Sequence, residues 1–170
     1  YAESMLTRWQ EKNPNVPPLR ALDKGLTHCF VSMAGGFLLL GELTGKSDYT
    51  QEGFRRLATF RQMLHAGPRG GLIWRHDVPN FGIGNQGYPA IDYVSHTVEV
   101  LQTLAHEGYV DDAMMQQIAA GVRDNILRGG DDITEQLDGS GRLLTDGAKY
   151  SHNTLPGLAF WDSAGQFAAV

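Results

Sequence analysis

The stretch FLLLGELTGKSDYTQEGFRRLATF, from Phe37 to Phe60, decides the fold class of this chain. It joins the end of one apolar helical pattern to the start of an amphipathic one through the short segment TGKSD. Gly45 suits the end of a helix because glycine adopts left-handed backbone angles at little cost, and Asp48 followed by Gln51 suits a capped start. The stretch therefore predicts an antiparallel helix hairpin that turns at Gly45.

Apolar residues recur at helical spacing on both sides of this hairpin. The predicted helical segments cover residues 2–9, 26–40, 48–64, 89–105, 111–126 and 158–170. Pro89 favours a first helical turn, and Asp111 or Asp112 is expected to begin the fifth segment. Gly35 and Gly36 interrupt the nearly all-apolar second segment, where they allow another backbone or a ligand to come close. On the third segment, a solvent-facing side is expected for Arg55, Arg56 and Arg61.

The two central hairpins share a spacing. Gly108 follows Gly45 by 63 residues, and Leu127 follows Leu64 by the same 63. The repeated unit is a helix hairpin followed by a long glycine-rich connection. Stacked hairpins bury faces that one hairpin cannot bury alone, so the repeat predicts hairpins packed side by side.

The two connections, residues 67–88 and 129–156, are longer than the ~12–15 residues usual for loops in compact domains. Loops of that length usually carry function, and we expect both to lie at one edge of the helices around a cavity. Residues 135–147 also predict a small β-hairpin, and residues 71–78 predict a short strand.

The composition is that of one globular domain spanning residues 1–170. A hydrophobic share of 42% argues against disorder, and a net charge of −5 argues against nucleic acid, which proteins bind chiefly through basic surface. No apolar run approaches the ~18 residues of a membrane span, and no signal peptide is evident. The first residue is Tyr1, so the location stays open, with the cytoplasm favoured.

The single cysteine, Cys29, excludes an internal disulfide and a thiolate metal cluster. It lies in the apolar pattern LTHCFVSMAGGFLLL, which favours a buried, inert thiol over a nucleophile paired with His28. For His28 a buried position is likewise favoured over one that points toward the edge of the helices.

Residues 71–96 gather hydrogen-bonding side chains between two apolar helices. Asp92 and His96 share a helix face, so the carboxylate can orient the imidazole as an acid or base; alternatively, the pair only caps the helix start. Tyr93 suits proton transfer in β-elimination from a uronate, or is an ordinary residue at the edge of the core.

The segment WRHD, residues 74–77, is the second group of candidates. Trp74 suits stacking on a pyranose ring, and His76 suits acid/base chemistry. In a strand Arg75 and Asp77 lie on one side, where they bind substrate or form a surface salt bridge.

After the second hairpin, the segment KYSHNTLPG places His152 and Asn153 in the position equivalent to the first loop. They are candidates for substrate binding, although Asn153 also suits a helix cap. No histidine spacing supports a zinc site made of His76, His96 and His152, so we expect neither metal nor cofactor.

The hairpin of residues 37–60, the segments GLIWRHD and AIDYVSHTVEVL, and the segment LPGLAFWD together resemble the (α/α) toroid, or six-hairpin glycosidase-like, superfamily. The resemblance implies an all-α fold of antiparallel helix hairpins that form part of a toroid. It also implies that AIDYVSHTVEVL is the Asp- and His-bearing helix start of uronate-directed lyases and epimerases. Such toroids contain more hairpins than this chain supplies, so we expect a homo- or hetero-oligomeric partner, or further sequence, to complete the ring.

The function predicted from these observations is lyase-type acid/base chemistry on a carboxylate-bearing saccharide, and the predicted catalytic residues are His96, Tyr93, His76 and Asp92. The predicted substrate-binding residues are Trp74, Arg75, Asp77, Asn85, Gln86, Tyr88, His152, Asn153 and Trp161. Two alternatives stay open: a subunit of a heteromeric small-molecule biosynthetic enzyme whose site a partner completes, and a non-catalytic helical-hairpin binding subunit. Hydrolysis would need a carboxylate pair, for which Asp77 and Asp92 are the candidates.

Overall fold

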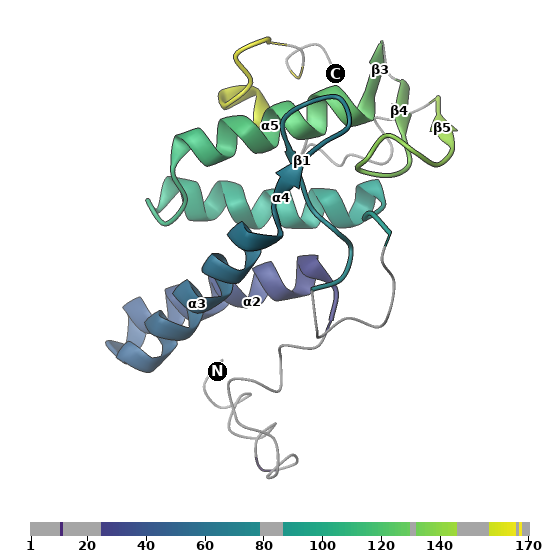
Figure 1. The fold of residues 1–170 in the computed structure, drawn as a ribbon. Coiled ribbons are helices and arrows are strands. Elements are labelled where there is room, and N and C mark those ends of the chain that lie inside the picture. The colour runs from purple at the N-terminus through teal and green to yellow at the C-terminus, as the bar shows by residue number, and fades with distance from the viewer. Residues whose placement is uncertain are drawn as a thin grey trace.

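The computed structural model describes residues 11, 25–78, 87–129, 132–145, 157–165 and 167. Within these residues the chain forms two antiparallel helix hairpins and a short 3₁₀ turn (Figure 1). The helices are α2 (Thr27–Thr44), α3 (Ser47–Met63), α4 (Ile91–His106) and α5 (Asp112–Ile126), and the 3₁₀ turn is η1 (Leu158–Phe160). The four central helices predicted from periodicity are confirmed, while the predicted segment 2–9 lies outside the described residues.

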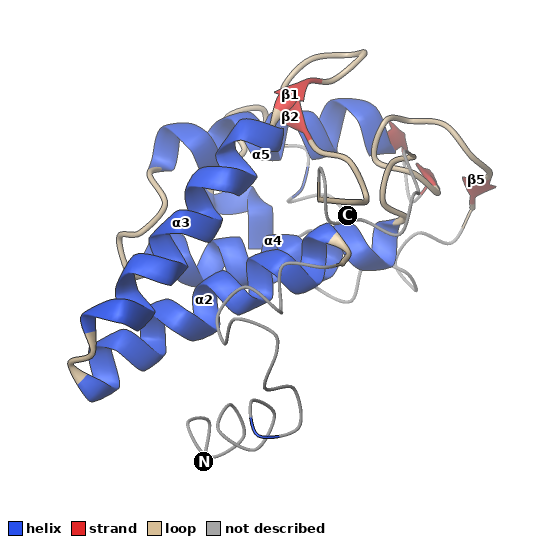
Figure 2. Cartoon of the chain, turned by 60° about the horizontal axis from the view of Figure 1, so that its bottom comes forward, coloured by secondary structure: helices blue, strands red, loops and turns tan. Residues whose placement is uncertain are grey.

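Each hairpin is followed by a small antiparallel sheet, drawn in red in Figure 2. The first sheet pairs β1 (His65–Ala66) with β2 (Leu72–Ile73), and the second has the order β3 (Leu127–Gly129), β4 (Asp132–Thr134), β5 (Leu143–Leu144). The pairing of β4 with β5 confirms the β-hairpin predicted in the second connection. The short strand predicted within residues 71–78 is confirmed as β2.

Local signals set several of the helix ends, although Pro89 precedes the N-cap of α4, Ala90, and does not lie in the first turn as predicted. Gly45 and Gly108 follow α2 and α4 with left-handed φ angles of 68° and 79°. Asp111 caps α5, where its Oδ1 accepts a hydrogen bond of 2.8 Å from the Met114 N–H. The capped start predicted for the third helix is wrong: α3 begins at Ser47 after Lys46, which makes no side-chain capping bond.

The first hairpin packs tightly because glycines lie where its helices meet. A Cβ at Gly53 would come within 2.6 Å of the Leu38 side chain, so α2 and α3 approach more closely there than larger residues allow. Arg56 is fully buried between the helices, with its guanidinium 4.8 Å from the ring of Phe30 and bonded to Glu52 at 2.8 Å. The expectation that Arg56 faces solvent is therefore wrong: the charge is compensated inside the hairpin.

Helices α2 and α4 lie alongside each other in parallel, since the start of α2 contacts the start of α4 and the middle contacts the middle. A Cβ at Gly35 would lie 3.1 Å from a methyl group of Val100, so this glycine does let the neighbouring helix come close. Around this contact the apolar faces of all four helices form one core, which includes Leu38, Phe60, Leu101, Ile118 and Val122.

The first connection packs against the second hairpin. Gly71 lies on Gly121 of α5 so closely that no side chain fits at either position. The fully buried Asn125 fastens the contact: its amide donates to the carbonyls of Gly70 and Gly121, and its oxygen accepts from the Arg69 N–H. The two hairpins are therefore joined by the turn between β1 and β2 as well as by their helices.

Both connections meet the helix starts. Thr27 donates its backbone N–H to His76 at 2.8 Å, and Ile91 donates its backbone N–H to Glu135 at 2.9 Å. The first bond joins the first connection to the start of α2, and the second joins the second connection to the start of α4. The described parts of the two connections therefore meet one edge of the helices, as predicted, whereas the cavity predicted at that edge stays a prediction.

Two further predictions need correction or stay open. The last apolar segment is not a long helix in its described part, which contains only η1 and turns. The hairpins agree with a predominantly helical fold, whereas the toroid itself stays a prediction. No helix among the described residues combines the length and apolar character that a membrane crossing requires.

Candidate functional site

Four ring-bearing side chains come together at the edge where α2 and α4 begin. We call them the histidine–tyrosine cluster: His28, His76, Tyr93 and His96. The ring of His28 is stacked on that of Tyr93, with centroids 4.6 Å apart and planes inclined by 21°. His76 meets Tyr93 edge to face at 5.0 Å, and the rings of His28 and His96 are 6.2 Å apart.

Three separate segments position this cluster. His28 lies in the first turn of α2, and Tyr93 and His96 lie three residues apart on one face of α4. His76 is held through its backbone, whose N–H donates to Gly87 and whose carbonyl accepts from Thr27. The Thr27 hydroxyl also donates to the Arg75 carbonyl at 2.7 Å, so two bonds from one residue register the connection on the helix start.

The cluster is buried at one side and open at the other. His76 is 8% exposed and His28 is partly buried, whereas Tyr93 is 38% exposed and His96 is exposed. Burial, followed by the charges of His76 and His96, lowers the pKa of His28 below its usual value of 6.5. Its Nδ1 is buried and has no hydrogen-bond partner within the described part of the chain. The neutral form of His28 is therefore favoured at neutral pH.

Cys29 lies beside this cluster, with its Sγ 3.2 Å from the Nε2 of His28. The expectation of a buried thiol is wrong, because Cys29 is exposed on the outer side of α2. The apolar pattern around it misled the prediction: neighbouring residues on a helix point in different directions, and position 29 points away from the core.

Arg75 and Tyr88 belong to a second group of contacts. The Arg75 guanidinium lies 4.1 Å from the centre of the Tyr88 ring, and the Tyr88 hydroxyl is 3.3 Å from the Nε2 of His65. These contacts link Arg75 and Tyr88 to His65, at the start of β1.

Both predicted tryptophan platforms are buried. Trp74 is 0% exposed and packs edge to face on Phe60, and its indole nitrogen has no hydrogen-bond partner among the described residues. Trp161 is 5% exposed and donates from its indole nitrogen to Asp112 at 2.9 Å, at the start of α5. Neither ring has an exposed face at the cluster on which a sugar can stack.

The remaining candidates divide into two kinds. Asp92 is exposed in the first turn of α4, one residue before Tyr93, and Asp77 is buried next to His76, where its backbone bridges to Leu26. The other predicted binding residues, which are Asn85, Gln86, His152 and Asn153, lie outside the described residues. Among the residues that the structure describes, no group of three or more histidine, cysteine or acidic side chains is arranged to hold a metal ion.

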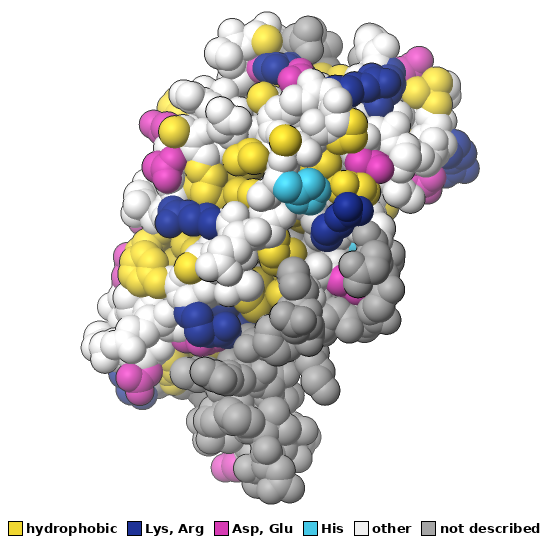
Figure 3. Space-filling model, viewed as in Figure 1, with side chains coloured by type: hydrophobic (Ala, Val, Ile, Leu, Met, Phe, Trp, Pro, Cys, Tyr) yellow, Lys and Arg dark blue, Asp and Glu magenta, His cyan; other side chains and the backbone are white. Residues whose placement is uncertain are grey.

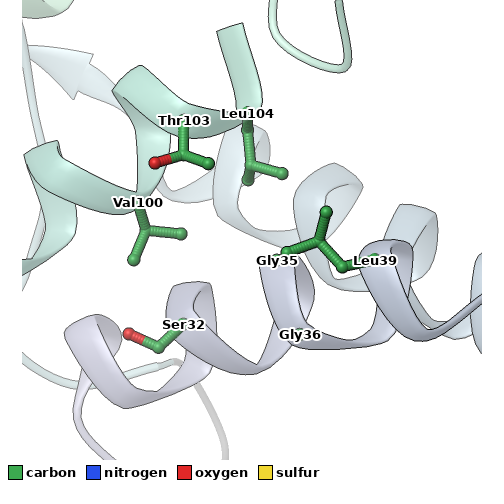
Figure 4. A pocket seen from close by; sticks show the side chains of 7 residues that line it. All are labelled: Ser32, Gly35, Gly36, Leu39, Val100, Thr103 and Leu104. Atoms are coloured by element: carbon green, nitrogen blue, oxygen red, sulfur yellow. The ribbon is translucent and has the colours of Figure 1, made fainter. Parts of the chain in front are cut away.

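An apolar groove of about 180 Å³ runs between α2 and α4, beyond the cluster (Figure 4). Gly35, Gly36 and Leu39 form its α2 wall, and Val100, Thr103 and Leu104 form its α4 wall. No titratable side chain lines the groove, so it can hold an apolar group but supplies no acid or base. The face seen in Figure 3 mixes apolar side chains with scattered acidic and basic ones and shows no basic field.

Comparisons with family models, with curated proteins and with solved structures find no match for this chain. The function is therefore argued from the geometry of the cluster.

Sequence reasoning missed His28 as a member of the cluster, because it favoured a buried histidine in an apolar helix. A usable signal was present: His28 occupies the first turn of α2, as Tyr93 occupies the first turn of α4. Parallel neighbouring helices place their first turns side by side, so the predicted stacking of hairpins brings these two residues together.

Proposed function

We propose that this chain is an acid/base enzyme that acts on a carboxylate-bearing saccharide by carbon–oxygen lyase chemistry. The observation that carries the proposal is the convergence of four rings: Tyr93 contacts His28 and His76, and His28 in turn lies near His96. The cluster is exposed to solvent at His96 and Tyr93. Enzymes that transfer protons commonly use titratable side chains that converge in a partly desolvated site.

The chemistry requires two proton transfers. A base removes the proton at C5 of the uronate, the electrons form the C4–C5 double bond, and the C4–O bond breaks with its electron pair on the leaving oxygen. An acid then protonates that oxygen, so atoms and charge balance without an oxidant or a cofactor. In this proposal Tyr93 and His96 exchange protons with the substrate, His76 holds Tyr93 edge to face, and Asp92 stands beside them in the first turn of α4.

A product assay tests this proposal. Polyuronate chains are incubated with the protein, and the absorbance of the unsaturated uronate end group is followed over time. We expect product from the wild-type protein and a loss of about 10²-fold or more in Tyr93→Phe and His96→Ala. His106→Ala is the matched control, because His106 is an exposed histidine in the last turn of the same helix.

Full activity in both site variants would remove Tyr93 and His96 from the proposed roles. If none of the uronate chains tested gives product, and circular dichroism shows that the wild-type protein is folded, the lyase chemistry is contradicted.

A second candidate function, a subunit completed by a partner, is favoured by the outer side of α2. Leu43 is 85% exposed and Leu39 is 38% exposed there, next to the small side chains that line the groove. The same side suits a subunit of a heteromeric biosynthetic enzyme or a binding subunit without catalysis. The mass of the native particle, measured by light scattering, distinguishes the cases: a monomer that turns over polyuronate argues against a required partner.

A further inference from the structure

The histidine–tyrosine cluster holds one imidazole, that of His28, whose protonated form is disfavoured by its surroundings. His28 is stacked on Tyr93 and lies near both His76 and His96. Burial and these two neighbours together disfavour its protonated form. A charged imidazole at this place has a cost that a bound anion would offset.

Other titratable groups lie around the cluster. Cys29 contacts His28 on α2, Asp77 follows His76 in the first connection, and Asp92 precedes Tyr93 on α4. From the second connection, Glu135 is occupied by a hydrogen bond of 3.2 Å from the Arg142 N–H to its carboxylate. The charges that lower the pKa of His28 are those of the two histidines.

Histidines are the groups that the structure places against Tyr93, with His28 stacked on its ring and His76 at its edge. The Arg75 guanidinium, which the sequence assigned to carboxylate binding, lies on the ring of Tyr88, and Asn85 and Gln86 lie outside the described residues. A substrate carboxylate at Tyr93 therefore lies next to imidazole rings.

We infer that His28, His76 and His96 form a proton-linked binding site for a carboxylate group. Exposed His96 makes the direct contact, and partly buried His28 takes up the proton that the anion stabilises. Histidine suits this role because its charge changes within the physiological pH range, and a protonated imidazole donates from both nitrogens. The inference rests on the proposed function for its choice of a uronate as ligand, but not for the binding itself.

Calorimetry with sodium glucuronate, in two buffers of different ionisation enthalpy at the same pH, tests the inference on the whole chain. We expect net proton uptake on binding, and an affinity that falls by up to about tenfold for each unit of pH increase above the histidine pKa values. Glucose, which has the same ring without the carboxylate, is expected not to bind measurably at the concentrations at which glucuronate binds. Binding of glucuronate without proton exchange, or equal binding of glucose, would overturn the inference.

Variants sharpen the test. His28→Asn is expected to abolish most of the proton uptake, and His96→Gln to weaken glucuronate binding by about tenfold or more at acid pH. His106→Gln is expected to behave as the wild-type protein does. Unchanged proton uptake in both site variants would contradict the assignment.

A titration of the wild-type protein keeps the test decisive if a variant does not fold. Histidine ring protons followed by nuclear magnetic resonance are expected to show at least one pKa that rises when glucuronate is added; constant pKa values would overturn the inference. The product assay separates the two proposals. Proton-linked binding without product refutes the lyase chemistry alone, and product without proton uptake refutes the carboxylate site alone.

Discussion

The two ends of α4 carry aromatic and histidine side chains in similar number but in different roles. At its start, Tyr93 and His96 meet rings from α2 and from the first connection, with one edge open to solvent. At its end, His106 meets Trp161 at 5.6 Å, and the indole nitrogen of Trp161 is already bonded to Asp112. His96 and His106 are ten residues apart on one helix, about 15 Å along its axis.

The difference teaches that residue type alone does not mark a site. The indole at the end of α4 is buried and hydrogen-bonded, which is how aromatic residues stabilise a fold. At the start of α4, rings are partly exposed, and the buried Nδ1 of His28 has no hydrogen-bond partner among the described residues. Such an arrangement lowers stability, which proteins tolerate at sites where chemistry needs reactive groups. Four changes test this contrast, from the largest expected effect to the smallest.

Replacing Trp161 by alanine is expected to have the largest effect, because it removes a nearly fully buried ring together with its bond to Asp112. We expect a loss of about 3–5 kcal/mol in the free energy of unfolding, measured with urea. Tyr93→Ala, at the other end, is expected to cost clearly less because that ring is 38% exposed. Equal losses would show that both ends serve stability alike.

Tyr93→Phe is expected to lower uronate turnover by about 10²-fold or more while the free energy of unfolding changes by less than about 1 kcal/mol. The reason is that only the hydroxyl is removed, and the ring that stacks on His28 remains. Phe160→Leu, at the far end, serves as the matched control and should keep the turnover of the wild-type protein, since Phe160 is exposed and packs beside Trp161. A smaller loss at Tyr93 than at Phe160 would reverse the assignment of the two ends.

The lowered pKa of His28 predicts a pH dependence of stability. The unfolded histidine protonates near pH 6.5 and the folded one only at lower pH, so the unfolded state binds more protons in between. Stability is therefore fully present above pH 6.5 and is lost as the pH falls through the folded pKa. His28→Asn is expected to flatten this loss in urea titrations repeated across the range; an identical slope in both proteins would argue against it.

The smallest effect is expected just beyond the end of α4, where the Tyr109 hydroxyl donates to the Glu42 carboxylate. This hydrogen bond, with lesser contributions from desolvation and from the charges of Glu42 and Glu107, raises the pKa of Tyr109 to about 12. Glu42→Gln is expected to move that pKa back toward 10, seen in the ultraviolet absorbance of tyrosinate. Stability should change little because the pair is on the surface; an unmoved titration would show that the bond does not persist in solution.

The sequence predicted those features that depend on neighbours along the chain. Apolar periodicity located α2, α3, α4 and α5, and the turn glycines Gly45 and Gly108 were found with the left-handed angles that only glycine adopts readily. The Asp111 cap and the β4–β5 hairpin were predicted on the same local grounds. His76, Tyr93 and His96 were named from their place around the long connection, and the structure brings them together.

Residues whose role depends on packing were misjudged. Arg56 is of a residue type usually found at the surface. Its charge is buried because α2 supplies aromatic rings and Glu52 supplies a carboxylate. Trp74 is of a residue type that often stacks on sugar rings, yet here Phe60 of the preceding helix packs against it. Cys29 has apolar neighbours along the chain, yet it points away from the core.

The sequence by itself determined which segments coil, where they turn and which side chains carry titratable groups, because these properties follow from residue type and spacing. Only the tertiary structure decided which of those side chains meet. Burial and proximity are set by elements far apart in the chain: α2, the first connection and α4 bring His28, His76 and Tyr93 together over 66 residues. If α4 were rotated by a few tens of degrees about its own axis, the sequence would show the same helical periodicity, but Tyr93 would not meet His28 and His76.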